Sequence, residues 1–235
     1  MIGTPGRLNG RALLRWAVRG LLGLLAVSVL WTLLYRVVDP PGTLLMAVRA
    51  LQGARDADYR PVGIEEISPH LARAVMAGED TRFCLHGGVD WEAVEDAQEA
   101  NRRGRPLRGA STISMQTAKN AFLWPGRTWL RKGAELYYTL LAEALWPKRR
   151  IMETYLNIAE WGDGLYGAEA AARAHFGVPA AKLTPHQAAL MAAVLPNPRR
   201  WNPARPTAYI QARAGVIRQR MAIVERDRLD SCLRE

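Results

Sequence analysis

The chain has 235 residues, of which 49% are apolar and 23% charged, an ordinary balance for one globular domain with an appendage. Its formal net charge of +10 could attract nucleic acid, anionic lipid or an anionic substrate, and composition alone does not choose among these. The two cysteines, Cys84 and Cys232, lack the spacing of zinc ligands, which argues against a metal-built or disulfide-built scaffold. A bridge between them is compatible with an oxidising compartment, but we expect two free thiols.

An apolar run from Leu13 to Tyr35 is long enough for one membrane-spanning helix of about 20 residues. No small-x-small cleavage site follows it, so the pattern favours an uncleaved anchor over a signal peptide or a buried core helix. Arg7 and Arg11 precede the run, Arg15 and Arg19 lie near its start, and only Arg36 follows closely, which by the positive-inside rule places the N-terminus in the cytoplasm. We therefore predict a cytoplasmic N-terminus over residues 1–12, an anchor over 13–38 and an exported remainder with no nucleic-acid partner.

Residues 39–60 are predicted to be a linker that carries a short apolar segment. The apolar side chains are Leu44, Leu45, Met46, Val48 and Leu51. Their pattern fits an interfacial helix on the outer leaflet and equally a first core helix, and both interpretations stay open.

Caps and breakers divide the rest of the chain into predicted helices, whose expected starting residues are Asp90, either Ser111 or Thr112, Thr128 and Thr184. Without a run of alternating β-branched residues long enough for a sheet, residues 61–235 are expected to be mainly α-helical. In the helix from Thr128 to Trp146 the predicted core stripe is Leu130, Ala134, Tyr137, Leu141, Ala144 and Leu145. The expected helices cover residues 69–78, 91–101, 112–120, 128–146, 149–159, 168–175, 185–195 and 208–226.

The pair Glu79-Asp80 follows the first of these helices, which is capped by Ser68 and ended by Gly78. The helix dipole and the neighbouring carboxylate both disfavour the charged form of Glu79, so we expect its pKa to be raised toward that of a general acid or base. An isolated pair of this kind is usually a solvated loop. Two further stretches, which lie on the helices over residues 112–120 and 128–146, favour a functional role for the pair over that interpretation.

Polar and charged side chains gather on one face of each of the next two long helices. Gln116, Lys119 and Asn120 lie three and four residues apart, so they can point into one cleft. On the following helix, Glu135 can pair with Arg131 at i+4 and with Lys132 at i+3, which by itself describes an exposed ion-pair face.

Together these blocks resemble the signature motifs of the peptidoglycan glycosyltransferases, glycosyltransferase family 51. The likeness extends from about Pro61 to Pro203, with the blocks in the family's order. The first block matches at Glu79, Asp80, Phe83, His86 and Gly88, the second from Gly109 to Asn120, the third at Arg131, Lys132 and Glu135, and the fourth at Tyr155, Leu156, Asn157, Gly162, Tyr166 and Gly167.

The resemblance implies a lysozyme-like two-lobed helical domain over residues 61–235, preceded by the single transmembrane helix. It also implies an enzyme of cell-wall biosynthesis that polymerises lipid II into β-1,4-linked glycan and releases undecaprenyl diphosphate. Such an enzyme sits in the bacterial inner membrane with its catalytic domain in the periplasm. Its partners are lipid II, the nascent strand and membrane lipids, and binding to the cell-wall synthesis machinery stays open.

The family's functional positions transfer to this chain motif by motif. The resemblance implies that Glu79 is the catalytic base and that Glu135 is a second catalytic residue that orients the cations. It implies no required cofactor and no dedicated metal site, and leaves open assistance by Mg²⁺ at the diphosphate. The implied substrate-binding residues are Asp80, Phe83, His86, Ser111, Thr112, Gln116, Lys119, Asn120, Arg127, Arg131 and Lys132.

Two rival functions are a lysozyme-like lytic muramidase and a non-enzymatic, membrane-anchored wall-binding scaffold. A muramidase has no diphosphate to neutralise, so Lys119, Arg131 and Lys132 favour a synthase, and a scaffold would not need Glu79 or Glu135. No serine is followed three residues later by lysine, so a penicillin-binding transpeptidase site is not expected and the enzyme is predicted to be monofunctional.

Overall fold

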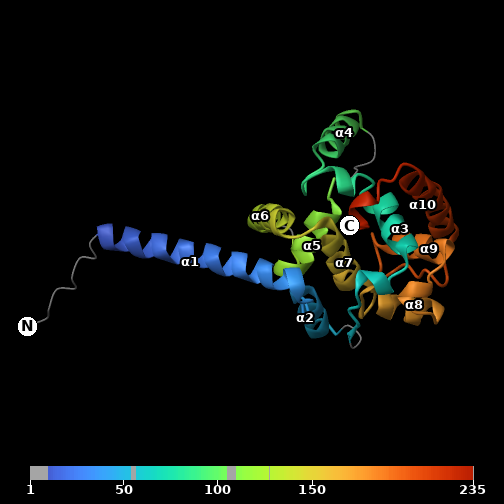
Figure 1. Ribbon diagram of the computed structural model, residues 1–235, viewed down its shortest axis with the longest axis horizontal. Coiled ribbons are helices and arrows are strands. Elements are labelled where there is room, and N and C mark those ends of the chain that lie inside the picture. Colours follow the sequence, from blue (N-terminus) through green and yellow to red (C-terminus); the bar gives the residue numbers. More distant parts are fainter. Residues whose placement is uncertain (1–9, 54–56, 105–109, 127, 235) are drawn as a thin grey trace, which may run out of the picture. The chain divides into compact units, whose positions relative to one another are not determined.

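The computed structural model describes residues 10–53, 57–104, 110–126 and 128–234. The chain divides into two compact units, Met1–Val38 and Asp39–Glu235, which are described separately. In the first unit, α1 (Gly10–Val37) is a 28-residue helix, labelled in Figure 1. It is long and apolar enough to cross a membrane, as the sequence predicts.

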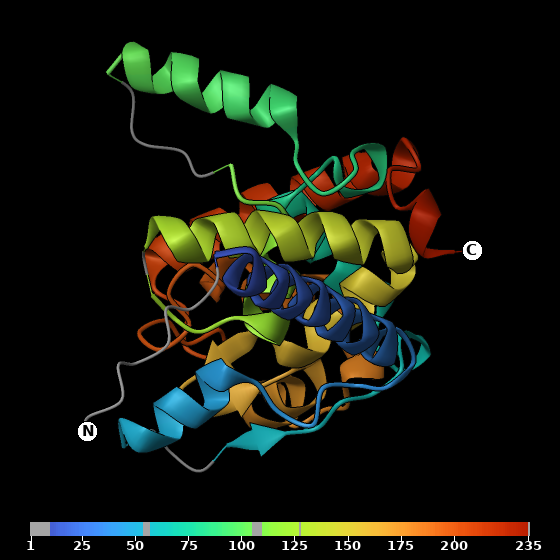
Figure 2. The same ribbon diagram turned by 90° about the vertical axis from the view of Figure 1, so that its left-hand side faces the viewer.

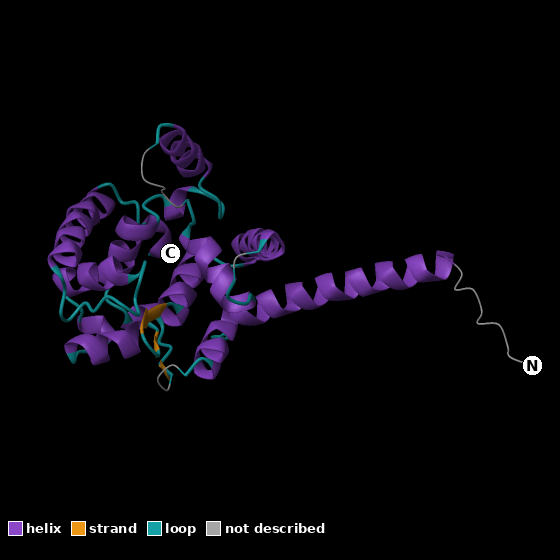
Figure 3. Cartoon of the chain, turned by 180° about the vertical axis from the view of Figure 1, so that it is seen from behind, coloured by secondary structure: helices purple, strands orange, loops and turns teal. Residues whose placement is uncertain are grey.

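The second unit is mainly α-helical, which confirms the predicted fold class (Figure 3). The likeness to lysozyme stays a prediction. Among the described residues, short 3-10 turns lie between the longer elements or after the last one: η1 (Ile64–Glu66), η2 (Phe83–Leu85), η3 (Ala180–Lys182) and η4 (Ser231–Leu233). The helices are α2 (Leu44–Leu51), α3 (Pro69–Glu79), α4 (Trp91–Arg102), α5 (Ile113–Phe122), α6 (Trp129–Leu145), α7 (Lys148–Ile158), α8 (Ala168–Phe176), α9 (Pro185–Val194) and α10 (Ala208–Arg226).

Side-chain caps start several of these helices where the sequence predicts. Asp90, Thr112, Thr128 and Thr184 each accept a hydrogen bond from a backbone N–H in the first turn of the helix that follows. Ser68 precedes α3 as expected, but its side chain accepts no capping hydrogen bond, and its hydroxyl donates to the carbonyl of Leu183 at 2.9 Å. That bond connects the start of α3 to the segment before α9.

Two groups of helices form the core of the second unit. In one, α3, α9 and α10 pack against one another, and in the other α5 packs between α6 and α7 (Figure 1). Gly78 does not end α3 as predicted. It lies inside the helix, where a Cβ would come within 3.3 Å of Ile217 on α10, so the missing side chain permits close packing. In contrast, α4 lies apart from the other helices of its unit in both Figure 1 and Figure 2.

A three-stranded sheet, in the order β1-β3-β2, contradicts the prediction that no sheet forms. β2 (Glu160–Gly162) and β3 (Leu165–Tyr166) are antiparallel, and β1 (Asp58–Tyr59) pairs in parallel with β3. Strands of two or three residues are too short to show an alternating pattern. The hairpin leads into α8 through Gly167, whose φ of 87° and close approach to the carbonyl of Asn157 exclude a side chain.

The predicted core stripe of α6 is wrong. Leu130 is 77% exposed, whereas the helix buries Arg131, Glu135, Thr139 and Ala142. Periodicity locates an apolar face but cannot say which face meets the rest of the protein. In α6 the face turned inward carries charged groups, which is the first sign that the structure uses this helix for more than packing.

The expectation of two free thiols is also wrong, because Cys84 and Cys232 form a disulfide. The cysteines are 148 residues apart in the chain, and their Cα atoms lie 5.6 Å apart. Arg73 on α3 holds Asp230 through a 2.8 Å ion pair just before η4. This tertiary contact joins the C-terminal turn to α3, and sequence spacing could not show it.

Candidate active site

Glu79 is the last residue of α3, and its side chain is only 16% exposed. Its Oε2 accepts a 3.0 Å hydrogen bond from the amide of Gln116 on α5. Arg213 on α10 lies 3.9 Å from Oε1. The carboxylate therefore stands where three helices meet, in a partly closed position that suits an acid or base.

Burial is the main cause that raises the pKa of Glu79 above its usual value. The hydrogen bond from Gln116 and the charges of Arg213 and Lys119 oppose the rise, and Asp80 adds to it. The direction agrees with the sequence prediction. The chief cause differs, since desolvation outweighs the neighbouring carboxylate.

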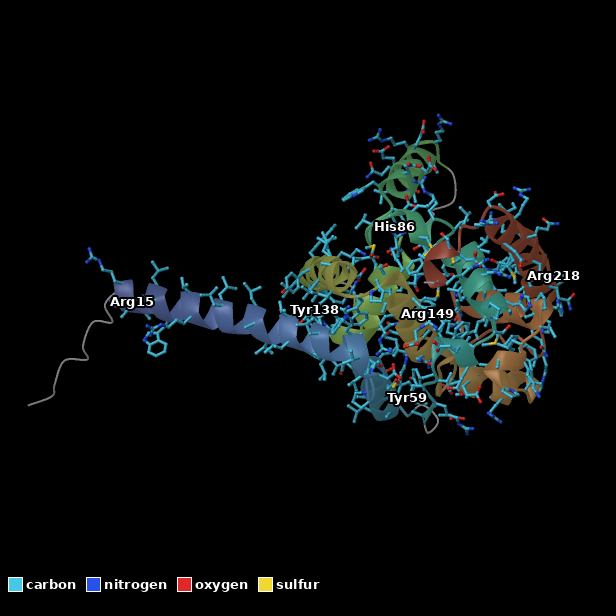
Figure 4. The ribbon with its side chains drawn as sticks, in the orientation of Figure 1. Arg15, Tyr59, His86, Tyr138, Arg149 and Arg218 are labelled. Carbon is cyan, nitrogen blue, oxygen red and sulfur yellow. A yellow bond between two sulfur atoms is a disulfide. The ribbon has the colours of Figure 1, made fainter. Side chains whose placement is uncertain are left out.

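Asp80 turns away from Glu79 and joins the motif loop to the start of α5. Its Oδ2 accepts the backbone N–H of Ile113 at 3.0 Å, and its carboxylate also meets Nε2 of His86. Because the N–H of Gly88 donates to Nδ1 of His86, Nε2 carries the hydrogen that is donated to Asp80. His86 is labelled in Figure 4. Asp80 and His86 thus hold the loop that follows Glu79.

Two other residues predicted to bind substrate are buried and hold the same loop. Phe83 has no exposed surface and packs under the ammonium of Lys148, 4.5 Å from the ring centre. Thr112 caps α5 and donates a 2.5 Å hydrogen bond to the carbonyl of Gly88. Gly88 has a φ of 96° and its Cα faces Thr139 of α6, so it leaves no room for a side chain. We assign Phe83 and Thr112 to positioning rather than to substrate contact.

The polar face predicted for α5 does line a cavity of about 410 Å³. Gln116, Lys119 and Asn120 all border it, together with Tyr155 of α7. A volume of this size lies in the range of small-molecule sites. Burial lowers the pKa of Lys119, while the charge of Glu135 raises it and those of Arg131 and Lys132 lower it.

The charged face of α6 is built around Glu135, which is 3% exposed. Its two oxygens are bound by Arg131 and by Lys132, the latter at 2.6 Å, as the i+4 and i+3 spacing predicts. Arg131 is itself buried and its Nε has no hydrogen-bond partner. The charges of Glu135, Arg131 and Lys132 all act on the pKa of Lys119. The cluster therefore contains three cations and one carboxylate, and its net charge is positive.

Two predicted residues lie outside this arrangement. Ser111 is exposed and contributes no hydrogen bond to the loop or to α5, where Thr112 is the cap. Arg127 falls outside the described residues.

The structure adds three residues that the sequence analysis did not select. Arg213 lies on the last helix, with nothing near it in the chain to mark its approach to Glu79. Arg49 of α2 and Glu160 of β2 border the same cavity as Lys119 and Asn120. For Glu160, the signal in the sequence is the group of three glycines that follows it, Gly162, Gly164 and Gly167.

Two clusters of ionisable side chains could be considered as ligands for Mg²⁺, and in both the carboxylate oxygens are already engaged. Asp80, His86 and Asp90 offer ligand atoms within 4.8 Å of one another, but these atoms already serve the backbone of α5 and α4 and each other. Beside the cations, both oxygens of Glu135 are engaged. No free carboxylate pair of the kind Mg²⁺ prefers is present in these two clusters.

Comparison with known proteins gives a consistent result. The family model described as Transglycosylase matches residues 46–222. A biosynthetic peptidoglycan transglycosylase of Rhodospirillum centenum is 64% identical over 221 residues, which cover 94% of this chain and 96% of the relative. Proteins of the same description from Caulobacter vibrioides and Pseudomonas fluorescens are 48% and 50% identical, over 97% and 90% of this chain and 99% and 90% of their own.

Proposed function

Since the chain belongs to the transglycosylase family and is a peptidoglycan glycosyltransferase of cell-wall synthesis, we propose that it polymerises lipid II into β-1,4-linked glycan and releases undecaprenyl diphosphate. The family and the names of its relatives support the reaction class. The geometry of the site supports the finer assignment of substrate and residues.

The observation that carries the proposal is the net positive cluster formed by the charged face of α6 and Lys119 of α5. Arg131 and Lys132 bind Glu135, the charges of all three act on Lys119, and one nitrogen of Arg131 has no hydrogen-bond partner among the described residues. Buried cations are costly unless an anion offsets them, so the cluster is suited to an anionic group such as a diphosphate. A lytic muramidase, which cuts a neutral glycosidic bond, would have no such group to hold.

Glu79 is the general base in this proposal. Its raised pKa brings proton uptake closer to neutral pH, where it accepts the proton of the 4-hydroxyl of the incoming sugar. Gln116 keeps Oε2 in place and leaves Oε1 facing Arg213 at 3.9 Å, beyond a close ion pair. Asp80 and His86 fix the loop behind the base, so the carboxylate is held without being neutralised.

Arg131, Lys132 and Lys119 stabilise the departing diphosphate on the other side of the reacting carbon. A diphosphate leaves as an anion and needs its charge held rather than a proton supplied. Glu135 orients Arg131 and Lys132 by binding both at once. No step in this mechanism depends on a divalent cation.

In the cell, we place α1 across the inner membrane with the N-terminus in the cytoplasm and the domain in the periplasm. The arginine excess before the span supports this orientation. Within the second unit, α2 buries Met46 but leaves Leu44 50% and Leu51 89% exposed. An amphipathic helix with exposed leucines, close in sequence to the anchor, supports the interfacial interpretation of α2.

The decisive experiment replaces Glu79 with Gln in the full chain and measures polymer formed from lipid II. The substitution keeps shape and removes the proton acceptor, so the rate should fall by about 10² to 10⁴. Glu66→Gln, which changes an exposed carboxylate on η1, serves as the matched control and should be fully active. Polymer formation by Glu79→Gln at the wild-type rate would refute the assignment of the base.

A further inference from the structure

A largely buried ion pair joins three helices to residues 80–88, the segment after Glu79 that we call the base loop. Lys148, the first residue of α7, donates to Oε1 of Glu143 on α6 at 2.7 Å, and the side chains of Lys148 and Glu143 are 17% and 10% exposed. The hydroxyl of Ser114 on α5 donates to the same oxygen. The ammonium of Lys148 also lies 4.5 Å from the ring centre of Phe83 in the base loop.

The end of the base loop packs against the same part of α6. A Cβ on Gly88 would lie 3.1 Å from Cγ of Glu143 and 2.8 Å from Cγ2 of Thr139, so the backbone of the loop lies directly on these two side chains. The base loop is thus held at two points. Phe83 is held through Lys148, and Gly88 is held by α6 itself.

These contacts lie on the same row of α6 as the diphosphate cations. Side chains at intervals of four residues form one row along a helix. The α6 row consists of Arg131, Glu135, Thr139 and Glu143. It is about 18 Å long, with the cation cluster at its first end and the base loop at its last. Because α6 is continuous over this length, it sets the distance between the two ends.

We propose that Glu143 and Lys148 are positioning residues, which hold the base loop at one end of the α6 row so that Glu79 keeps its distance from the cations at the other end. The reaction needs the incoming hydroxyl and the departing diphosphate on opposite sides of one carbon. A misplacement of about 1 Å in such an arrangement can cost about 10²-fold in rate. The inference rests on the proposed function, because that function assigns the base and the diphosphate cations.

Stability alone is a poor explanation for this ion pair. Replacing a buried ion pair by apolar groups is often neutral or stabilising, so a pair that served only the core would gain little. Both partners here make further contacts that lead to the site. The carboxylate of Glu143 is bound by α5, and the ammonium of Lys148 covers Phe83, which has no exposed surface.

The test compares neutral variants of the full chain with lipid II in vesicles. Glu143→Gln or Lys148→Met alone leaves one buried charge without its partner and should lower the Tm. The double variant Glu143→Gln/Lys148→Met leaves no such charge. Its kcat should fall about 10- to 100-fold while KM changes little, because the lost contacts place the base and do not bind substrate. Lys148→Arg, which keeps a cation between Glu143 and Phe83, should recover part of the rate.

The pH–rate profile separates positioning from a general loss of stability. Burial is the main cause that raises the pKa of Glu79. The charges that act on this pKa are those of Arg213, Asp80 and Lys119. Glu143 and Lys148 are therefore expected to affect Glu79 through the base loop. A loosened loop exposes the carboxylate and lowers its pKa toward the usual value, so the acid limb of the double variant should move to lower pH.

An ion pair on α8 provides the matched control. Arg173 and Glu169 are 2.5 Å apart, the side chain of Glu169 is 11% exposed, and none of the residues assigned to the site lies on α8. Glu169→Gln/Arg173→Met should keep the wild-type kcat and acid limb. Thermal unfolding reports on the fold of each variant.

A folded Glu143→Gln/Lys148→Met variant with the wild-type kcat and acid limb would overturn the proposal, as would an equal loss of kcat in the α8 control. If the double variant does not fold, Ser114→Ala decides the question, because it frees Glu143 from α5 without leaving a charge unpaired. Its kcat should fall and its acid limb should move to lower pH, and no change in either would refute the positioning role. A wild-type chain that makes no polymer would refute the proposed function and this inference with it.

Discussion

Replacing both cysteines with serine should destabilise the domain considerably, because the disulfide closes a very long loop. Cys84 and Cys232 are separated by 148 residues. In the chain-entropy description, a loop of that length stabilises the folded state by about 5 kcal/mol at 25 °C. For a chain of this size about 1 kcal/mol corresponds to a Tm change of 2–4 °C, so the double variant should melt about 10–20 °C lower.

Thermal unfolding of the purified chain, followed by tryptophan fluorescence with and without reductant, tests this prediction. Reductant should lower the Tm of the wild type to that of Cys84→Ser/Cys232→Ser and should leave the double variant unchanged. Turnover at room temperature should persist, because α3 and the bonds of Asp80 still hold Glu79. A double variant that melts with the wild type in both conditions would refute the reasoning, as would alkylation of either thiol in the untreated protein.

Three more outcomes are expected. Lys132→Ala should slow polymerisation by about 10² to 10³. Lys132→Arg should restore only part of the rate, because a planar guanidinium and a compact ammonium bind phosphate with different geometry. Full activity of the alanine variant would place the diphosphate elsewhere. Arg213→Met removes a charge that lowers the pKa of Glu79, so the acid limb of the pH–rate profile should move to higher pH. The control variant Arg218→Met, on the exposed face of the same helix, should leave the acid limb in place. Removing residues 1–38 should leave a folded domain. Its polymerisation rate should fall more on lipid II in vesicles than on lipid II in detergent, because the anchor concentrates enzyme and substrate in two dimensions. An equal loss of rate in vesicles and in detergent would contradict this prediction.

Local signals in the sequence were enough for much of this protein. The apolar run of α1, and the caps at Asp90, Thr112, Thr128 and Thr184, depend on residues within one or two helical turns. The pairing of Glu135 with Arg131 and Lys132 follows from helical spacing alone and is present as predicted.

Features that join distant parts of the chain had to come from the tertiary structure. The Cys84–Cys232 bridge needs η2 and η4 to meet, and the cluster around Glu79 needs α10 to bring Arg213 across from the far end of the chain. Which face of α6 is buried depends on its neighbours, so periodicity selected the apolar stripe while the fold buries Arg131 and Glu135.

Glu79 and Glu160 show most clearly which features the sequence determines and which the tertiary structure decides. For Glu79, sequence neighbours suggested the right direction of the pKa shift, but burial among three helices is its main cause, and burial is a property of the packed chain. Glu160 stands close to three glycines in the sequence, but only the structure places it in β2, on the wall of the same cavity as Lys119 and Asn120. Sequence spacing determines which side chains share a helix face, whereas only the packing of helices and strands decides which faces enclose the same space.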